Sequence, residues 1–395
     1  MNKNILLGVT GGIAAYKMVN VASTLTKKGY NVKVVMTESA TEFVTPLTFR
    51  SVTHNRVATE MFSTPDNYNV KHVSLAEHAD TVLIAPATAN FIAKMAQGLA
   101  DDLLSTLILA TEAPIMIAPS MNKNMYQNAI VQDNIEYLKK NGIEIIAPNT
   151  GYLACGDKGE GRLPEPELLS EFVIKKLTDN KFKDYQIMIT AGPTREAIDS
   201  VRYLSNYASG KMGYALARAA CYQGGEVTLI SGPTELDSAP GVNLKRVTSA
   251  REMDKMVKQY APEQDIIIMT AAVSDFRPEL EKKQKLKKEC WDGQLNLVSN
   301  PDILAELGQN KKDDQILVGF AAETDNLISN SQQKLEEKNL DMIIANDISR
   351  DDIGFASDEN QVVIMTDQTQ KELNKMSKLK LAYKILEQLY LNYIK

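Results

Sequence analysis

Residues that bind metals or form cross-links are scarce in this sequence, which has three cysteines, three histidines and one tryptophan among 395 residues. Cys155, Cys221 and Cys290 are too few and too far apart to build a disulfide framework or a cysteine-based zinc site. His72 and His78 are six positions apart, whereas a metal-binding pair on one helix needs a spacing of three or four. These shortages favour a reducing compartment and argue against a histidine metal site.

Long apolar runs and an excess of positive charge are also missing. No uncharged run approaches the roughly 20 residues that span a bilayer, and the first residues, MNKNILLGVTGG, lack the apolar core of a signal peptide. The formal net charge is −6, so the chain has no general attraction for nucleic acid. We therefore expect a cytoplasmic protein with no membrane or nucleic-acid partner, in which anions bind only at glycine loops, helix N-termini or lysine clusters.

Two series of alternating apolar strands and helices are present instead, one starting at NILLGV (4–9) and one at QIMITAG (186–192). This alternation predicts an α/β protein with two doubly wound Rossmann-like domains, each a parallel sheet covered on both faces. The polar stretch 180–185 suggests the linker, and we expect domains at 1–183 and 184–395. The expected strands are 4–9, 31–37, 80–87, 114–120, 143–148, 186–192, 226–232, 265–272, 315–322, 341–347 and 361–366, and the expected helices include 13–28, 210–223 and 378–390.

Small and hydroxyl-bearing residues follow three strands of the first half. They are Thr10, Gly11 and Gly12 after the first strand, Thr37 and Ser39 after the second, and Thr88, Ala89 and Asn90 after a later one. Glycines let a backbone approach an anion, and a helix N-terminus offers N–H groups to it. A single glycine turn is equally consistent with a turn that binds nothing, but three such strand ends together favour a phosphorylated ligand across the sheet edge.

Three side chains of the first half could carry chemistry. Cys155 lies in the glycine-rich stretch GYLACGDKGEGR (151–162), where a cysteine kept only for packing would be unusual. His72 could be a catalytic group or an ordinary structural or surface histidine. Asn122, in APSMNKNMY, could bind a carboxylate or cap a helix, and the cap is the commoner role. The residues alone leave these alternatives open.

Six short strings occur in one order across about residues 5–165: TGGIAAYK, KHVSL, PATANFIAK, ADDLLS, PSMNKNM and LACGDKGEGR. Each is weak evidence alone, but together they resemble the flavin-dependent cysteine decarboxylase family. The resemblance implies a flavodoxin-like domain that binds FMN. The residues implied to contact FMN are Thr10, Gly11, Gly12, Ile13, Thr37, Ser39, Ala87, Thr88, Ala89 and Asn90.

The same resemblance implies catalytic roles for the three candidate side chains. His72 would be the base or orienting group, Asn122 would bind the substrate carboxylate, and Cys155 would be the acid on a lid. In this family the substrate thiol is first oxidised to a thioaldehyde, so that the electrons left by CO₂ have an acceptor. The resulting enethiolate is then reduced and protonated, and a thiol on a closing glycine-rich loop could supply that proton.

Polar residues also follow strands in the second half. The stretch 190–213 connects a strand to a helix, and connections of that length in compact domains are usually functional. Its Asn206, Ser209 and Gly210 precede the helix N-terminus and suit an anion, although the spacing is not that of a Walker A motif. Asp275 follows a later strand and is available for Mg²⁺.

Lysines are concentrated in two places in this half, and each has two interpretations. The run RPELEKKQKLKKE (277–289) could be a solvated face or a flap that folds over a triphosphate. Lys334 and Lys338 are four residues apart on a predicted helix, where they could form surface ion pairs or contact a ligand together.

Residues from about 186 to 392 resemble phosphopantothenate–cysteine ligases, through the strings ITAGPTREAID, VRYLSN, SGKMG, AAVSDFR, KLKK, NPDIL, GFAAET and KNLDMIIAND. The resemblance implies CTP as co-substrate, with Mg²⁺ at Asp275. Asn206 would contact an acyl-cytidylate intermediate and Lys285 would assist turnover. The implied CTP contacts are Ala271, Ala272, Asp275, Lys285, Pro301, Asp302, Ile303, Leu304, Phe320, Lys334 and Lys338.

A decarboxylase half followed by a ligase half makes the whole chain similar to the bacterial bifunctional coenzyme A biosynthesis proteins. The resemblance implies 4′-phosphopantothenate, cysteine and CTP as substrates and 4′-phosphopantetheine as product, because the ligase product is the decarboxylase substrate. It also implies a homo-oligomer, with trimeric contacts between decarboxylase halves, dimeric contacts between ligase halves, and a dodecamer as the combined assembly.

Two other functions are alternatives to this one. An NAD-dependent oxidoreductase would be expected to show GxGxxG and an acidic residue about 20 positions later, and neither half does. A flavin-binding regulatory subunit is the second alternative. The joint presence of His72, Asn122 and Cys155 argues against that alternative. A yellow purified protein would favour the flavin-dependent enzyme, and a colourless protein with bound nicotinamide would favour the oxidoreductase.

We expect Cys155→Ser to abolish CO₂ release and the formation of the saturated product, because a hydroxyl is a much weaker acid than a thiol. Flavin should still be bound and reduced in this variant. Flavin absorbance and product mass, followed in the same single-turnover reaction, measure the two steps separately. Turnover equal to that of the parent protein would contradict the proton-donor role.

Overall fold

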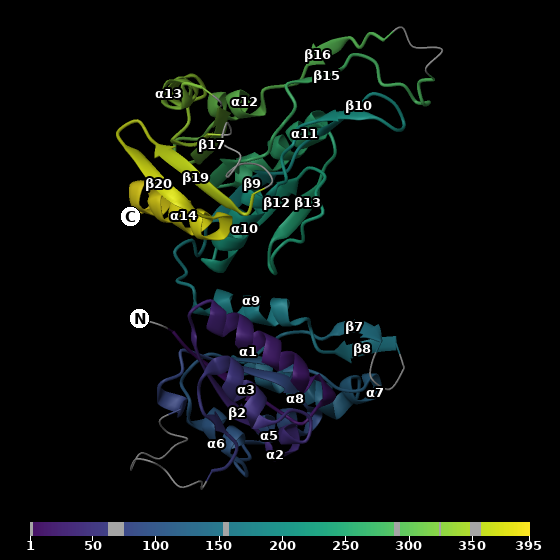
Figure 1. Cartoon of the computed structure of the whole chain (residues 1–395), viewed down its shortest axis with the longest axis vertical. Helices are drawn as coiled ribbons and strands as arrows, with labels where there is room; N and C mark the ends of the chain where they lie inside the picture. The colour runs from purple at the N-terminus through teal and green to yellow at the C-terminus, as the bar shows by residue number, and fades with distance from the viewer. Residues whose placement is uncertain (1–2, 62–74, 153–157, 288–292, 324, 348–356) are drawn as a thin grey trace. The chain divides into compact units, whose positions relative to one another are not determined.

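The computed structural model describes residues 3–61, 75–152, 158–287, 293–323, 325–347 and 357–395. The chain divides into two compact units, Met1–Thr178 and Asp179–Lys395 (Figure 1). Both units are doubly wound α/β sheets, so the predicted fold class is confirmed. Among the described residues, we find no helix that combines the length and the apolar composition needed to cross a bilayer.

The first unit is built on a parallel six-stranded sheet with the order β3-β2-β1-β4-β5-β6. This is the Rossmann order; flavodoxin has the order 2-1-3-4-5, so the unit is flavodoxin-like in its layers and not in its strand order. β1 and β4 are almost entirely buried, as expected for central parallel strands. The strands are β1 (Asn4–Val9), β2 (Asn31–Met36), β3 (Val57–Ala58), β4 (Thr81–Ala87), β5 (Ile115–Pro119) and β6 (Glu144–Ile145).

Alternate residues of β1 pack against helices on opposite faces of this sheet. Ile5 and Leu7 belong to the core that includes α1, α3 and α9, and Leu6 belongs to the core that includes α5, α6 and α8. The helices are α1 (Lys17–Lys27), α2 (Glu38–Thr41), α3 (Pro46–Thr53), α5 (Ala89–Gln97), α6 (Leu103–Ala110), α7 (Lys123–Tyr126), α8 (Ala129–Lys140) and α9 (Pro166–Leu177), with a 3₁₀ turn η1 (Ile13–Tyr16) before α1. An antiparallel pair, β7 (Asn149–Tyr152) and β8 (Lys158–Arg162), precedes α9.

The second unit has an eight-stranded sheet with the order β13-β12-β9-β14-β17-β18-β19-β20. The pairs from β13 to β18 are parallel, but β18–β19 and β19–β20 are antiparallel, so the prediction of a wholly parallel sheet was wrong at this edge. No clear sequence pattern predicts β20, because Leu373 is its only buried residue. The strands are β9 (Gln186–Ala191), β12 (Glu226–Ser231), β13 (Asn243–Arg246), β14 (Ile266–Met269), β17 (Ile316–Glu323), β18 (Met342–Asp347), β19 (Glu359–Met365) and β20 (Gln370–Ser377).

Helices cover both faces of the second sheet. Met253, Ile303 and Leu335 place α11, α12 and α13 on one face. α10 and α14 pack against each other, and α10 packs on β9 and β12. The helices are α10 (Lys211–Tyr222), α11 (Ala250–Tyr260), α12 (Ile303–Gln309), α13 (Leu327–Glu337) and α14 (Lys378–Tyr393), with a 3₁₀ turn η2 (Ala261–Glu263).

Two short hairpins occupy connections that the sequence suggested were irregular. β10 (Arg195–Ala197) pairs with β11 (Tyr203–Ser205), and β15 (Phe276–Pro278) pairs with β16 (Leu297–Ser299). β10 also contacts β15, so the two hairpins form one arm of the second unit, which Figure 1 shows beyond the edge of the main sheet. We call these residues and the 279–287 segment the arm.

Phe182 lies within the polar stretch that suggested a linker, yet its side chain is fully buried in the second unit. Its N–H donates to the carbonyl of Gln223 over 2.8 Å. Its ring packs edge-on against Tyr185 and Tyr390, with centroids 6.3 and 6.0 Å away. The residues that join the units therefore also anchor the start of the second one.

We expect Phe182→Ala to lower the free energy of unfolding of the second unit by about 3–5 kcal/mol, because it removes a buried ring and leaves a cavity. Urea unfolding of the full chain, followed by tyrosine fluorescence, measures the change. Tyr207→Ala is the control, since Tyr207 is 95% exposed. Equal, small effects of both substitutions would contradict the anchoring role.

Candidate functional sites at the two sheet edges

Both sheets reverse their strand order at the first strand of the unit, between β1 and β4 in one and between β9 and β14 in the other. The connections on the two sides of such a point lead to helices on opposite faces, which leaves a crevice at the carboxyl ends of the strands. The loops that the sequence singled out begin at these strand ends. Each unit therefore has one edge at which a ligand can approach the backbone.

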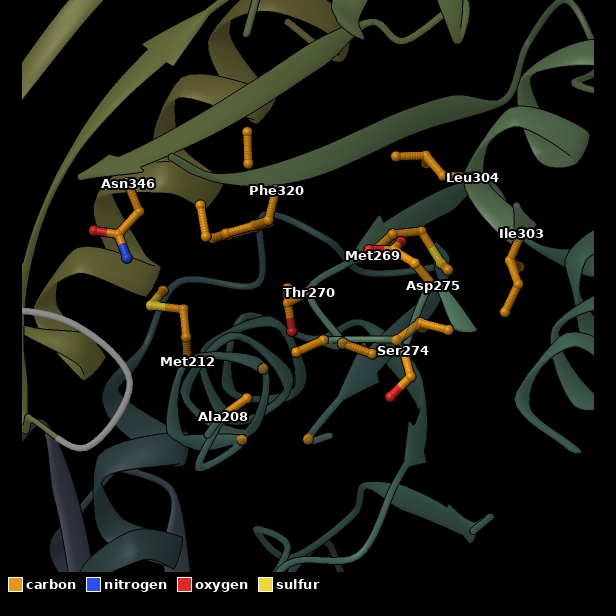
Figure 2. A pocket seen from close by; sticks show the side chains of 18 of the residues that line it. Ala208, Met212, Met269, Thr270, Ser274, Asp275, Ile303, Leu304, Phe320 and Asn346 are labelled. Carbon is orange, nitrogen blue, oxygen red and sulfur yellow. The ribbon is translucent and has the colours of Figure 1, made fainter. Parts of the chain in front are cut away.

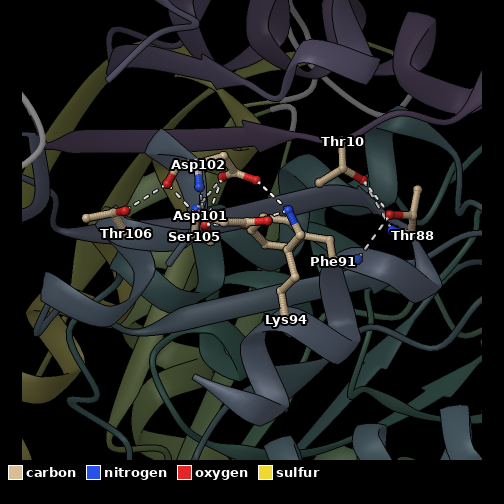
Figure 3. Close-up of polar contacts among 8 residues, drawn as sticks. All are labelled: Thr10, Thr88, Phe91, Lys94, Asp101, Asp102, Ser105 and Thr106. Carbon is tan, nitrogen blue, oxygen red and sulfur yellow. Dashed lines mark hydrogen bonds and ion pairs between the residues drawn. The ribbon is translucent and has the colours of Figure 1, made fainter. Parts of the chain in front are cut away.

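Hydroxyl groups tie together the loops on the two sides of the first crevice. Thr10 is buried, and its Oγ1 donates to the carbonyl of Pro86 over 2.6 Å. The N–H of Thr88 donates to Thr10 Oγ1 over 3.2 Å, and Thr88 Oγ1 caps α5 by accepting from the N–H of Phe91 (Figure 3). The loops after β1 and β4 are thus held in one arrangement before any ligand binds.

Gly11 and Thr37 show that this crevice can accept a close polar ligand. A Cβ added to Gly11 would lie 2.3 Å from Cβ of Ser39, so only glycine lets the loops after β1 and β2 approach each other. Thr37 Oγ1 is buried and has no hydrogen-bond partner in the part of the chain that the structure describes. A buried hydroxyl without a partner is costly, and a ligand phosphate or ring nitrogen at this edge would satisfy it. These residues therefore fit a flavin nucleotide.

The other residues predicted to contact FMN lie at the same edge. Ile13 is exposed in η1, Ala87 ends β4, and Ala89 and Asn90 begin α5. The structure thus brings together loops that are 78 residues apart, as the contact of Thr10 with Thr88 shows.

A charged cluster beside this edge was not predicted from the sequence. Lys94 Nζ lies 2.6 Å from Asp101 and 3.0 Å from Asp102, and only 17% of its side chain is exposed (Figure 3). Asp102 also accepts from the N–H of Ser105, whose hydroxyl accepts in turn from the N–H of Asp102. This capping box orders the start of α6, and the ion pair with Lys94 ties it to α5. The string ADDLLS was a recognisable signal, but its partner Lys94 is visible only in the fold.

Asn122 caps a helix, which is one of the two roles that the sequence left open. Its Oδ1 accepts from the N–H of Asn124 over 2.8 Å and caps α7, while the same side chain carries the Nδ2 hydrogens that a carboxylate needs. The neighbouring N–H of Met121 donates to the carbonyl of Gly161. A Cβ on Gly161 would lie 2.3 Å from the carbonyl oxygen of Met121, so this contact requires glycine. His72 and Cys155 lie outside the described residues.

A cavity of about 510 Å³ lies at the reversal point of the second sheet (Figure 2). Its walls come from the ends of β9, β14, β17 and β18 and from the starts of α10, α12 and α14. Most residues predicted to contact CTP line it: Ala271, Ala272, Asp275, Pro301, Asp302, Ile303, Leu304, Phe320 and Lys338. Residues separated by almost seventy positions in the sequence therefore share one hollow.

Asp302 and Lys338 form an ion pair in the wall of this cavity. Lys338 Nζ lies 2.8 Å from Asp302 Oδ2, and Asp302 Oδ1 caps α12 by accepting from the N–H of Ala305. Burial raises the pKa of the Asp302 carboxyl, but the bonds from Lys338 and Ala305 outweigh burial and lower it. The carboxylate is thus charged and ready to accept a hydrogen bond from a ligand.

Three predicted residues do not line the cavity. Asn206 lies beside it, where its Nδ2 donates to the carbonyl of Ala272 over 3.0 Å. Lys334 pairs with Glu323, so the predicted pair of lysines is divided between two carboxylates. Lys285 is exposed on the arm. The structure therefore separates Lys285 and Lys334 from the cavity walls, and it assigns them no contact with a ligand.

Asp199 holds the lysine-bearing segment of the arm to the β10–β11 hairpin. Its carboxylate is fully buried and accepts from the guanidinium of Arg202 at 2.6 Å, from the N–H of Leu286 at 3.1 Å and from two N–H groups of its own turn. The bond from Arg202 and these N–H groups hold the pKa of Asp199 well below its usual range. Lys285 is next to Leu286, so Asp199 fixes its backbone.

Asp275 is the candidate for binding Mg²⁺. Within the described ranges, no three His, Cys, Asp or Glu side chains converge in a way that could hold a metal ion. Mg²⁺ with nucleotides is commonly bound by one or two carboxylates and by substrate phosphates. One aspartate in the cavity wall is compatible with that mode.

Known protein families match the two units separately. The Flavoprotein family model matches residues 1–178, and the model of the DNA/pantothenate metabolism flavoprotein C-terminal domain matches residues 182–391. The coenzyme A biosynthesis bifunctional protein CoaBC of Vibrio vulnificus is 45% identical over 98% of this chain and 97% of its own. That of Bacillus subtilis is 46% identical over 98% of this chain and 97% of its own. A crystal structure of the C-terminal domain of a CoaBC protein is 40% identical, with a TM-score of 0.47, over 54% of this chain and 97% of its own.

The folds, the two edges and the family models define a two-domain flavoprotein of pantothenate metabolism. The Flavoprotein match supports a flavin as cofactor of the first unit. With relatives of this identity over nearly its whole length, the chain belongs to the family of bifunctional coenzyme A biosynthesis proteins. The prediction of a bifunctional enzyme that carries a decarboxylase and a ligase is thereby confirmed.

We expect Asp199→Asn to loosen the arm, because the variant loses the charge that three sets of donors share. Hydrogen exchange at pH 7 should show that the protection of the backbone amides at 195–205 and 282–286 falls about tenfold or more. This is the effect expected when one charged hydrogen bond is weakened. The exposed Asp237→Asn is the control.

The stability that Asp199 contributes to the arm depends on pH in a defined direction. Because folding lowers the pKa of Asp199, its stabilising contribution is complete above the unfolded-state value of about 3.9 and is lost as pH falls through the lower folded value. Arm protection in the parent protein should therefore survive at pH 5, and equal protection in parent and variant at neutral pH would contradict the tethering role.

Proposed function

We propose that residues 184–395 join 4′-phosphopantothenate to cysteine at the expense of CTP, and that residues 1–183 decarboxylate the product with FMN to give 4′-phosphopantetheine. One observation supports this proposal: a single chain matches both families and has a set of predicted site residues at the edge of each sheet. The reaction order follows from the chemistry, because the amide made by ligation carries the cysteine carboxylate that decarboxylation removes.

In the ligase reaction, the carboxylate of phosphopantothenate attacks the α-phosphorus of CTP and forms an acyl-cytidylate, with pyrophosphate as leaving group. The amine of cysteine then attacks the acyl carbon, and CMP leaves. Negative charge builds on phosphate oxygens in the first step, so cations are the effective catalysts. Asp275 would hold Mg²⁺, which would supply positive charge to the phosphates, and Asn206, bonded to the carbonyl of Ala272, would contact the acyl-cytidylate.

The cavity wall suits the nucleotide. Phe320 offers an aromatic face, and the Asp302–Lys338 pair offers both an acceptor and a donor near the N-terminus of α12. Lys285 and Lys334 would act only if the arm and α13 moved toward the bound nucleotide, because neither lines the cavity. Lys285 in particular is on an exposed segment, which suits a group that closes over a triphosphate after it binds.

In the decarboxylase reaction, the bound flavin supplies reversible two-electron redox chemistry at the substrate thiol. The residues implied to hold it are the loop residues after β1, β2 and β4, with Thr37 Oγ1 as a donor or acceptor that needs a partner. Asn122 would bind the substrate carboxylate through Nδ2 while Oδ1 keeps its loop in place. His72 would orient the substrate or accept a proton, and Cys155 would deliver the final proton.

Assembly and location belong to the same proposal. Large apolar side chains are exposed on the first unit, among them Ile13 at 58%, Leu47 at 67% and Ile130 at 71%. Exposed apolar groups of this kind favour contacts between copies. We propose a cytoplasmic homo-oligomer with trimeric contacts between first units and dimeric contacts between second units, which combine in a dodecamer.

We expect Asn206→Asp to block turnover of the acyl-cytidylate, because a carboxylate there repels the anionic intermediate and cannot donate to it. Mass spectrometry of reactions with phosphopantothenate, cysteine, Mg²⁺ and either CTP or ATP measures product and trapped intermediate. Lys285→Gln should slow the same reaction. Decarboxylation of supplied phosphopantothenoylcysteine should be unchanged in both variants, and its loss in either would contradict the division of activities between the units.

A further inference from the structure

The first crevice receives loops from strands that are not neighbours in the sheet. The loop 10–12 follows β1, and the turn that carries Asn122 follows β5, but β4 lies between these two strands. No ladder hydrogen bond can therefore join the two strand ends directly. Their separation matters in the proposed reaction, because one loop would hold the flavin and the other would hold the substrate carboxylate.

Lys17 is a buried lysine directly behind the loop 10–12. It is the first residue of α1, and η1 connects it to Gly12, whose carbonyl accepts from the N–H of Ala15 over 2.9 Å. Only 8% of Lys17 is exposed. Lysine is almost never buried to this extent unless its charge is paired, so the reason for Lys17 lies in the groups that its ammonium contacts.

Those groups belong to the segment that joins β8 to α9. Lys17 Nζ donates to Glu165 Oε2 over 3.0 Å and to the carbonyl of Leu163 over 3.4 Å. Glu165 also accepts from the guanidinium of Arg162, the last residue of β8, over 2.6 Å. The hydrogen bond from Lys17 is the main cause that lowers the pKa of the Glu165 carboxyl, so this carboxylate is charged at neutral pH. Lys17 thus connects the start of α1 to the end of β8.

The segment that Lys17 holds is stiff. Pro164 and Pro166 flank Glu165, whose backbone is extended at φ −66° and ψ 149°, as expected for a residue before proline. Both prolines are buried. A segment with so few accessible backbone conformations transmits the position of Lys17 to β8 instead of absorbing it.

β8 in turn packs against the turn of Asn122. The N–H of Met121 donates to the carbonyl of Gly161 over 3.1 Å. A Cβ on Gly159 would lie 2.6 Å from Cδ of Lys123, and a Cβ on Gly161 would lie 2.3 Å from the carbonyl oxygen of Met121. These approaches leave no room for β8 to shift toward the turn. The contacts therefore form a continuous series from the loop 10–12, through Lys17 and β8, to Asn122.

Helix packing alone does not call for a lysine at this position. α1 packs against α9 through apolar side chains such as Val21, Leu25, Leu169 and Val173 (Figure 1). An apolar side chain of similar length at position 17 would extend this contact without the cost of burying an ammonium group. What an apolar side chain could not do is bond to Glu165 and to the carbonyl of Leu163.

We propose that Lys17 is a positioning residue of the decarboxylase, which holds β8 and the turn of Asn122 at a set distance from the loop 10–12. This inference rests on the proposed function of the first unit and adds to it a residue that touches neither the flavin nor the substrate. Its effect should appear in the rate at which the bound substrate reduces the flavin, because a displacement of about 1 Å between reacting groups can cost about a hundredfold in rate.

The test compares Lys17→Met with Lys27→Met, an exposed lysine at the end of the same helix. In anaerobic single turnovers of the full chain with phosphopantothenoylcysteine, flavin absorbance gives the rate constant of flavin reduction at saturating substrate. Lys17→Met should lower this constant about 10- to 100-fold, and Lys27→Met should leave it unchanged. Lys17→Arg keeps the charge and the donors and should stay within about fivefold of the parent value.

Two further measurements separate positioning from a structural role. The dissociation constant of the flavin should change about threefold at most in Lys17→Met. Dithionite should reduce the bound flavin as fast as in the parent protein, because that reaction needs no aligned substrate. A loss of flavin affinity as large as the loss of rate would make Lys17 a structural residue and overturn the inference.

Glu165→Gln tests the same contact from its exposed side, with the exposed Glu167→Gln as control. It should slow flavin reduction about three- to tenfold, and the double variant with Lys17→Met should be no slower than Lys17→Met alone, because both changes remove one interaction. If Lys17→Met does not fold, Glu165→Gln decides the question, and reduction at the parent rate overturns the inference. A parent protein whose flavin phosphopantothenoylcysteine does not reduce would instead overturn the proposed function.

Discussion

The constraint on which this protein depends is that a parallel sheet must be buried on both faces. Strands such as β1, β4, β9 and β14 are buried along almost their whole length, so their faces hold helices and leave no room for a ligand. The backbone is accessible only where a strand ends. Chemistry is therefore confined to the carboxyl edge of each sheet, and the reversal of strand order decides where on that edge a crevice opens. Both units obey this rule independently, and one chain can consequently carry two unrelated reactions.

Within each crevice, internal hydrogen bonds fix the loops and leave selected polar atoms without partners. In the first unit, Thr10 and Thr88 bond the loops to each other, whereas Thr37 keeps an unpartnered hydroxyl among the described residues. In the second, Asn300 donates to the carbonyl of Ser274, whereas Asn346 Oδ1 has no partner within the described ranges. Loops ordered in advance cost less free energy to bind a ligand, and buried groups without partners make the matching ligand more favourable.

The sequence predicted those parts of the fold that depend on local patterns. Apolar runs located almost every buried strand, and glycine-rich and hydroxyl-rich strand ends identified both edges. β20 was missed because an edge strand with one buried residue has no periodic signal and carries lysines that discourage further pairing. Lys94 was missed because only the fold shows that it reaches Asp101 and Asp102 at the start of α6, and Lys211 was missed because its partner Asp358 is 147 positions away. Lys334 shows the reverse case, since its helical spacing from Lys338 was real, but Glu323 occupies its ammonium group.

The charged side chains of the second cavity lie at two separate places. Here the lysines are divided by the sheet, with Lys338 on the α12–α13 face and Lys211 and Lys378 on the α10–α14 face. The edge between them, at Thr270 to Ala272, is nearly uncharged and is bonded to Thr190 and Asn206. A ligand in this cavity can therefore meet cations on both faces of the sheet, whereas Thr270, Ala271 and Ala272 between them offer backbone groups and a hydroxyl.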